Sequence, residues 1–243
     1  MATNAVWNTG LILLRFRYFA NMLIMNFQTP ETNQTLARLQ YIQHLRRELP
    51  AFDPNGTAML VIDMQNRFAR LWNRQTDTVN FNILSDFICK VRDTGLPVIR
   101  TQHGHTNPEL DGGVLHKWWE GSIIENTLAH RFIKGFEPVH GDDVIQKKRY
   151  DAFIDTPLET ILKEKNIHTL IVSGVMTNLC CETTARSAFC RDYNVIFLID
   201  GTATVDEIMH RSSLLNLGFG FAYLATCKET AAWLHQDKID EKD

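Results

Sequence analysis

Residues 174–186 read Gly-Val-Met-Thr-Asn-Leu-Cys-Cys-Glu-Thr-Thr-Ala-Arg, and they directly follow the apolar, β-type segment 169–173. Ala185, Ala188 and Phe189 then recur at helical spacing. This pattern predicts a strand that ends near residue 173, a bend that contains glycine, and a helix that begins near residue 178. A strand and a helix joined by a short turn indicate an α/β fold.

Cys180 falls in the first turn of this predicted helix. Free backbone N–H groups and the helix dipole favour negative charge there, which lowers the pKa of a thiol and stabilises the reactive thiolate. The same N–H groups can hold the oxyanion that forms when a thiolate attacks a carbonyl. Cys180 is therefore a candidate nucleophile. The alternative is a small buried residue that only fills space in the core.

Two other segments place charged residues at the ends of predicted strands. Asp63 follows the apolar run 58–62, and ligands of open α/β sheets bind at the carboxyl ends of the strands. The structural alternative for Asp63 is N-capping of the next segment. Lys147 ends the short strand 143–147 and begins a Lys-Lys-Arg run, for which a solvated basic patch is the alternative.

Together these segments resemble the isochorismatase-like cysteine hydrolase superfamily. The matching motifs are Val-Ile-Asp-Met-Gln-Asn at 61–66, Lys-Lys-Arg-Tyr-Asp-Ala-Phe at 147–153, and the stretch 174–186, in the order that the family shows. The resemblance extends over residues 55–235. It assigns the family's catalytic aspartate, lysine and cysteine to Asp63, Lys147 and Cys180.

The resemblance also separates these residues from their neighbours. It excludes Lys148 and Cys181 from the catalytic roles, because the family's lysine precedes the phenylalanine by six positions and a small apolar residue follows its cysteine. It implies a cis peptide bond before Met176. It further implies that the backbone N–H groups of Met176 and Cys180 form the oxyanion hole.

The resemblance implies an enzyme that cleaves the C–N bond of a small amide or of a carbamoyl or ureido substrate, through a thioester intermediate. Isochorismatases cleave a vinyl ether without this cysteine, so the intact set favours amide hydrolysis. The pattern from Arg149 to Leu158 is closer to ureidoacrylate and N-carbamoyl amidohydrolases than to nicotinamidases. The alternatives are a nicotinamidase- or isochorismatase-type hydrolase and a non-catalytic member that binds a metabolite or a partner protein.

A histidine-rich segment follows the second predicted strand. Nicotinamidases of the family bind a metal at Asp-x-His and a later histidine, whereas this chain has His103, His105 and His116. Imidazoles two positions apart on an extended segment face the same side and could share a zinc ion. Because a histidine replaces the family's aspartate, we expect no metal and no other cofactor.

We expect the substrate to meet side chains around the nucleophile. The expected contacts are Phe68, His103, His105, Trp119, Tyr150, Phe153 and Thr177. Trp118 and Trp119 lie in one long loop, where we expect them to cap the pocket or to fill a subunit contact. Packing in the core is the alternative.

Strand and helix patterns alternate along the chain. The expected strands are 57–63, 96–101, 143–147, 168–173, 194–199 and 219–225; the expected helices are 77–94, one near 120–130, 157–165, 178–190, 206–217 and a last one that ends near 235. The alternation predicts a three-layer α/β/α fold with a mainly parallel, Rossmann-like sheet.

The composition suits one catalytic domain. The chain has 243 residues and a net charge of −3, which does not suggest binding to nucleic acid. Five scattered cysteines without a secretory pattern favour a reducing compartment, and we expect a cytoplasmic protein. No apolar run is long enough to span a membrane. We expect a homo-oligomer, a dimer or tetramer, with a small-molecule amide as its substrate.

The first residues fit this domain least well. Residues 1–30 are expected to be a poorly ordered or spurious extension, with Met25 as an alternative start, and organelle targeting by residues 1–27 stays open. Residues 31–50 carry an apolar stripe and are expected to form a helical arm of a single domain 31–243. This arm could pack on its own domain or dock onto a neighbouring subunit.

Overall fold

The computed structural model describes residues 45–69, 81–119 and 121–235. The expectations for residues 1–44 and for the start of the helix 77–94 therefore lie outside the described residues. Residues 46–50 have no regular secondary structure, so the predicted helix 31–50 does not continue to its expected end. Instead, Pro50 accepts a hydrogen bond of 2.7 Å from Trp233 Nε1, and Leu49 packs against the core.

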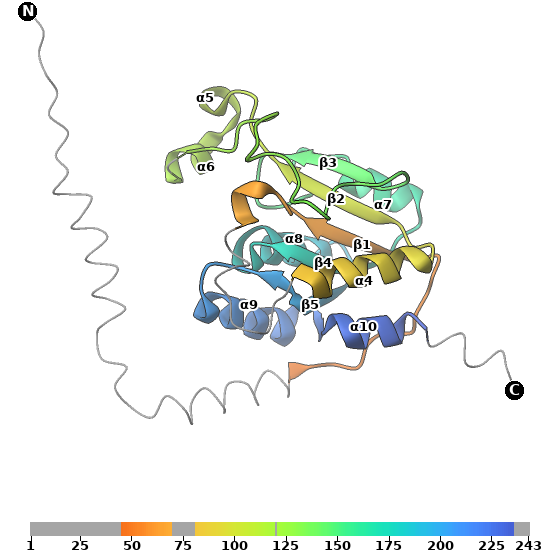
Figure 1. The fold of residues 1–243 in the computed structure, drawn as a ribbon. Helices are drawn as coiled ribbons and strands as arrows, with labels where there is room; N and C mark the ends of the chain where they lie inside the picture. The colour runs from red at the N-terminus through yellow and green to blue at the C-terminus, as the bar shows by residue number, and fades with distance from the viewer. Residues whose placement is uncertain (1–44, 70–80, 120, 236–243) are drawn as a thin grey trace, which may run out of the picture. The chain divides into compact units, whose positions relative to one another are not determined.

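A six-stranded sheet forms the centre of the fold (Figure 1). All its strands run parallel in the order β3-β2-β1-β4-β5-β6, which confirms the predicted α/β class. The strands are β1 (Thr57–Ile62), β2 (Val98–His103), β3 (Asp143–Lys147), β4 (Thr169–Val175), β5 (Asn194–Ala203) and β6 (Tyr223–Ala225). The residues of β1, β2 and β4 are all buried, as expected for strands covered on both faces.

Helices cover both faces of the sheet (Figure 1). The first layer contains α4 (Phe81–Asp93) and α10 (Cys227–Trp233), which pack against each other and against β5. The opposite layer contains α7 (Leu158–Glu164), α8 (Glu182–Phe189) and α9 (Glu207–Gly220). These two helical layers and the sheet form the predicted three-layer arrangement. Within the described residues, no helix has the length and apolar character needed to cross a bilayer.

The order of the strands places a crevice between β1 and β4. The chain moves from β1 outward to β2 and β3, and then returns to the other side of β1 with β4. Ligands of such doubly wound sheets bind outside the carboxyl ends of the strands, where the direction of winding reverses. The segments that carry Asp63 and Cys180 leave β1 and β4 at this edge.

Several predicted elements differ from the observed ones. The helix expected near residues 120–130 is wrong, because its described residues form turns and bridges, while α5 (Pro108–Asp111) and α6 (Gly113–Trp118) come earlier. β5 continues to Ala203, beyond the predicted end at 199, because its outer half still pairs with β4 across a register shift. β6 is shorter than predicted, since α9 extends to Gly220.

Apolar residues four positions apart in α4 do not all face the core. Phe87 and Val91 are buried, but Ile83 is 37% exposed. Leu84 and Ile88 are buried in its place. The helical period of 3.6 residues explains the difference, because a stripe with a constant spacing of four drifts around the helix.

Candidate active site

The structure brings Asp63, Lys147 and Cys180 together at the carboxyl edge of the sheet. Asp63 directly follows β1, Lys147 is the last residue of β3, and Cys180 lies in the turn after β4. Lys147 Nζ lies 2.7 Å from Asp63 Oδ2 and donates a hydrogen bond of 3.3 Å to Cys180 Sγ. The three residues are 0%, 1% and 7% exposed, respectively. One ammonium group therefore links the carboxylate to the sulfur in a nearly dry site.

The backbone before Cys180 has an unusual course. Gly174 has a φ of 109°, and a Cβ atom at this position would lie 2.1 Å from the Ile62 carbonyl oxygen of β1, so only glycine fits. The Val175–Met176 peptide bond is cis, as the resemblance implied. Residues Thr177–Cys181 then form a π-helical turn before α8, so the predicted helix 178–190 consists of two parts. Such turns frequently occur at functional sites.

The protonation of Cys180 differs from the expectation. Burial raises the pKa of the Cys180 thiol to about 12; the Lys147 ammonium opposes this rise, and the Asp63 carboxylate adds to it. The net lowering of this pKa expected at the helix N-terminus is not found in the free enzyme, because the sulfur is removed from water. The sulfur carries its proton at neutral pH.

The charge of Lys147 depends on its neighbours. Burial alone would lower the pKa of the Lys147 ammonium, but Asp63 and Cys180 outweigh burial and raise it above its usual value. Lys147 is therefore a permanent cation at neutral pH. Lys147 Nζ also donates a hydrogen bond of 2.9 Å to the Arg149 carbonyl, which helps to fix the ammonium group beside Asp63 and Cys180.

A cavity of about 420 Å³ opens beside Cys180. Five of the seven predicted substrate contacts line it: Phe68, His103, His105, Trp119 and Tyr150. Met176 and Cys180 also line the cavity, so the predicted oxyanion-hole residues border the same space as the thiol. Most of the wall is apolar, and Arg67 is the single Lys or Arg side chain among the described lining residues.

The other two predicted contacts, Phe153 and Thr177, lie elsewhere. Phe153 is buried, with its ring 6.1 Å from that of Tyr193 and under the Arg191 guanidinium, so it packs in the α/β interior. Thr177 is also buried, and its hydroxyl is 2.9 Å from His210 Nδ1 on α9. For these two residues a motif position did not determine the direction of the side chain.

The two tryptophans behave differently. Trp119 is 47% exposed, lines the cavity and donates a hydrogen bond of 2.5 Å from its Nε1 to the Tyr150 hydroxyl. Trp118 is 75% exposed. Packing in the core is therefore wrong for both residues, and Trp119 takes the predicted position at the pocket.

The three histidines do not form a metal site. The His103 and His105 rings meet edge to face with centroids 5.1 Å apart, but His105 Nδ1 is 3.0 Å from Asp111 Oδ1. His116 bonds to Ser122 and Glu109 through its two ring nitrogens. Among the residues that the structure describes, no three His, Cys, Asp or Glu side chains are placed to share a metal ion. The donor set therefore does not fit the metal of nicotinamidases.

His103 is a neutral group at the cavity wall. Burial and the nearby Lys147 ammonium lower the pKa of the His103 imidazole to about 4. Burial likewise lowers the pKa of His105. The cavity therefore offers polar but uncharged imidazoles to a substrate at neutral pH.

Sequence reasoning missed the residues that hold this site in place. The Thr101 hydroxyl contacts Asp63 twice, and the Gln65 side chain amide donates to the carbonyls of His103 and His130 at 2.9 and 2.8 Å. Both are fully buried. Thr101 could have been found as a hydroxyl on the strand next to Asp63, whereas nothing in the sequence pointed to the partners of Gln65.

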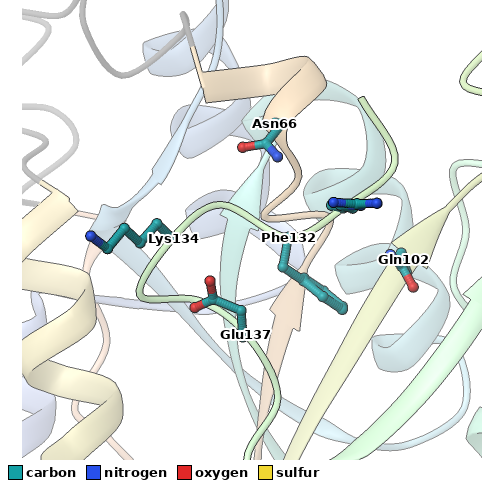
Figure 2. Close-up of a pocket in the computed structure, with 6 residues that line it drawn as sticks. Asn66, Gln102, Phe132, Lys134 and Glu137 are labelled. Carbon is teal, nitrogen blue, oxygen red and sulfur yellow. The ribbon is translucent and has the colours of Figure 1, made fainter. Parts of the chain in front are cut away.

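A second hollow, of about 640 Å³, is more open (Figure 2). The residues that line it are Asn66, Gln102, Arg131, Phe132, Lys134 and Glu137. None of the three residues Asp63, Lys147 and Cys180 borders it. The smaller cavity beside Cys180 is therefore the candidate active site.

Comparisons with known proteins identify the family. The isochorismatase domain matches residues 57–229. Nicotinamidase 3 of Arabidopsis thaliana is 42% identical over 181 residues, which cover 72% of this chain and 88% of that protein. Ureidoacrylate amidohydrolase RutB of Serratia proteamaculans is 28% identical over 247 residues, which cover 89% of this chain and 97% of that protein.

Solved structures share the fold. A cysteine hydrolase from Pseudomonas syringae pv. phaseolicola superposes with a TM-score of 0.70 at 24% identity, covering 77% of this chain and 96% of that one. The domain match alone spans more than half of the chain and includes all three catalytic candidates. The chain belongs to the isochorismatase family of hydrolases.

Proposed function

We propose that the protein is a cysteine-dependent amidohydrolase that cleaves the C–N bond of a small planar amide. The single observation that carries this proposal is the contact of Lys147 Nζ with both Asp63 and Cys180, beside a cavity that Cys180 lines. A non-catalytic binding protein would not need a buried ion pair against a thiol. Buried charges are costly, and charged groups of this kind cluster at functional sites.

The first half of the reaction forms a thioester. As Cys180 Sγ attacks the carbonyl carbon of the amide, its proton moves to the Asp63 carboxylate. The carbonyl oxygen becomes an oxyanion, which the N–H groups of Met176 and Cys180 would stabilise. Asp63 then gives the proton to the leaving nitrogen, the C–N bond breaks, and ammonia or an amine departs.

The second half releases the acid. Asp63, again a carboxylate, takes a proton from a water molecule that attacks the thioester carbonyl. The C–S bond breaks, the acid leaves, and the sulfur recovers the proton from Asp63. Lys147 keeps its charge throughout, so it can stabilise the sulfur whenever negative charge develops there.

The cavity and the comparisons favour a neutral aromatic carboxamide as the first substrate to test. Its wall includes the rings of Phe68, Trp119 and Tyr150 and two uncharged imidazoles, which suit a flat heterocycle. The relative with 42% identity is named a nicotinamidase. This identity reverses the preference for ureido substrates that the motif after Arg149 suggested.

A ureido acid is the second candidate, because relatives named ureidoacrylate amidohydrolase match the chain over most of its length. Arg67, at the cavity wall, could pair with the carboxylate of such a substrate. Steady-state release of ammonia from nicotinamide and from ureidoacrylate separates the two candidates by their kcat/KM values.

The decisive test compares two neighbouring cysteines. Cys180→Ser should abolish the release of ammonia, and mass spectrometry of the wild-type protein after rapid acid quenching should detect an acyl adduct on Cys180. Cys181→Ser is the matched control, because Cys181 is buried beside the site and its sulfur points to the Ser173 carbonyl. Equal loss of activity in both folded variants, or full activity in Cys180→Ser, would refute the proposal.

A further inference from the structure

Thr101 forms two hydrogen bonds with one residue of the active site. It lies on β2, next to β1, and its side chain is fully buried. The Asp63 backbone N–H donates to Thr101 Oγ1 at 3.1 Å, and Thr101 Oγ1 donates to Asp63 Oδ1 at 2.6 Å. One hydroxyl group therefore bonds to both the backbone and the carboxylate of Asp63.

The direction of these bonds follows from the chemistry of a hydroxyl group. A backbone N–H can only donate, so it uses a lone pair of Thr101 Oγ1. The single proton of the hydroxyl is then free to point at Asp63 Oδ1. A hydroxyl proton directed at a carboxylate favours its ionised form over the neutral acid.

The two carboxylate oxygens of Asp63 have different partners. Oδ1 is occupied by Thr101, and Oδ2 faces Lys147 Nζ at 2.7 Å. Lys147 Nζ also donates to Cys180 Sγ, so one ammonium group contacts both Asp63 Oδ2 and the sulfur. Asp63 itself has a φ of 49°, and the bond from its N–H helps to hold this left-handed conformation.

We propose that Thr101 is a positioning residue for catalysis: its hydroxyl holds the Asp63 carboxylate turned so that Oδ2 receives the proton of Cys180. This inference rests on the proposed function, since it assumes that Asp63 is the base. Thr101 does not touch the reacting atoms. It acts through Asp63 alone.

The charged groups around Asp63 determine what a change in the pH–rate profile means. Lys147 reaches it from β3, Cys180 and Cys181 face it from the turn after β4, and the neutral His103 approaches from β2. Changing Thr101 alters none of these charges. A shift of the acid limb of the pH–rate profile therefore reports the lost hydroxyl and not a lost ion.

The experiment uses the full chain and compares three variants with the wild type. Thr101→Val removes the hydroxyl at constant shape, and Thr101→Ser keeps it. Thr202→Val is the matched control, because Thr202 is a fully buried threonine of β5 whose hydroxyl donates only to the Leu198 carbonyl, at 2.9 Å. The measurements are kcat, KM and the pH dependence of kcat/KM on the amide that the wild type hydrolyses, with thermal unfolding as the check on folding.

We expect Thr101→Val to lower kcat by about ten- to a hundredfold, the loss typical of one hydrogen bond to a charged group, with little change in KM. We also expect it to move the acid limb of the pH–rate profile upward, because the carboxylate loses a hydrogen bond that favours its charged form. Thr101→Ser should restore both values to near wild type. Thr202→Val should lose stability without moving the pH profile.

Two results would overturn the inference. One is an unmoved acid limb in a folded Thr101→Val variant, and the other is a serine variant that behaves like the valine variant. If Thr101→Val does not fold, Thr101→Ala replaces it and is compared with Thr101→Ser in the same measurements. Failure of the proposed function is recognised separately, by full hydrolysis in Cys180→Ser or by no amide hydrolysis in the wild type.

Discussion

Lys147 Nζ and Asp63 Oδ2 lie 2.7 Å apart, and both side chains are completely buried. Taking two such charges out of water costs several kcal/mol per ion, which their attraction offsets only when the geometry is good. Buried ion pairs of this kind are weak contributors to stability. Here the proposed chemistry explains the pair better, because it holds a carboxylate and a permanent cation against one thiol.

Removing one partner of this pair should therefore be costly. Lys147→Met leaves the Asp63 charge buried without its cation, and we expect the free energy of unfolding to fall by about 3–5 kcal/mol, with loss of hydrolysis. Urea unfolding measures the first effect. An Asp63→Asn/Lys147→Met double variant should recover part of the stability and none of the activity. A single variant as stable as the wild type would contradict this account.

The neighbouring lysine provides the control for that measurement. Lys148 pairs with Asp111 at 2.7 Å, but its side chain is 44% exposed. Exposed pairs contribute about 0–1 kcal/mol. Lys148→Met should therefore change the free energy of unfolding by about 1 kcal/mol at most and leave hydrolysis in place.

The sequence led to Asp63, Lys147 and Cys180 through the resemblance to the family, and each lies at or shortly after the end of a strand of one parallel sheet, where strand ends share an edge. It could not predict that the thiol stays protonated. That property depends on burial by parts of the chain distant in sequence, including the pocket wall. For the same reason the sequence did not show that Phe153, an expected substrate contact, lies away from the cavity. A residue in a motif can point into the core as well as into the cavity.

The raised pKa of Cys180 predicts an unusual titration. The sulfur should remain a thiol through neutral and mildly alkaline pH, so the ultraviolet thiolate absorbance of the wild type minus that of Cys180→Ala should be absent there. The folded state keeps this proton up to about pH 12, whereas an ordinary thiol loses it near pH 9. The contribution of Cys180 to stability is therefore full below pH 9 and is lost as the pH rises from 9 to about 12. A thiolate signal at pH 7 would contradict this prediction.

Asp111 should control how firmly the segment of α5 and α6 covers the cavity. Its carboxylate contacts His105 Nδ1 at 3.0 Å, the Thr106 N–H at 3.1 Å and Lys148 Nζ at 2.7 Å, so it ties this segment to the ends of β2 and β3. Asp111→Asn removes the charge from these contacts. We expect a higher KM with kcat changed much less, because the variant loosens the cavity wall and leaves Asp63, Lys147 and Cys180 untouched.

The control for this prediction is Glu109→Gln. Glu109 is on the same helix and contacts only the exposed side of His116, at 3.1 Å. Its substitution should leave both constants near the wild-type values. An Asp111→Asn variant that loses kcat at an unchanged KM would show that the carboxylate acts on the chemistry instead of on the cavity wall.

Hydrolysis should survive exhaustive chelation. A metal shared by His103, His105 and His116 would need neutral nitrogens that converge on one point, yet both nitrogens of His116 already have partners, and no three His, Cys, Asp or Glu side chains of the described residues are placed to share an ion. A dication bound beside Cys180 could also capture the sulfur as a ligand and suppress its attack on the substrate. We expect full activity after dialysis against EDTA, with metal content followed by elemental analysis. Stoichiometric zinc or iron that is lost together with activity and restores it on addition would overturn this prediction, and would favour the metal-dependent chemistry of nicotinamidases.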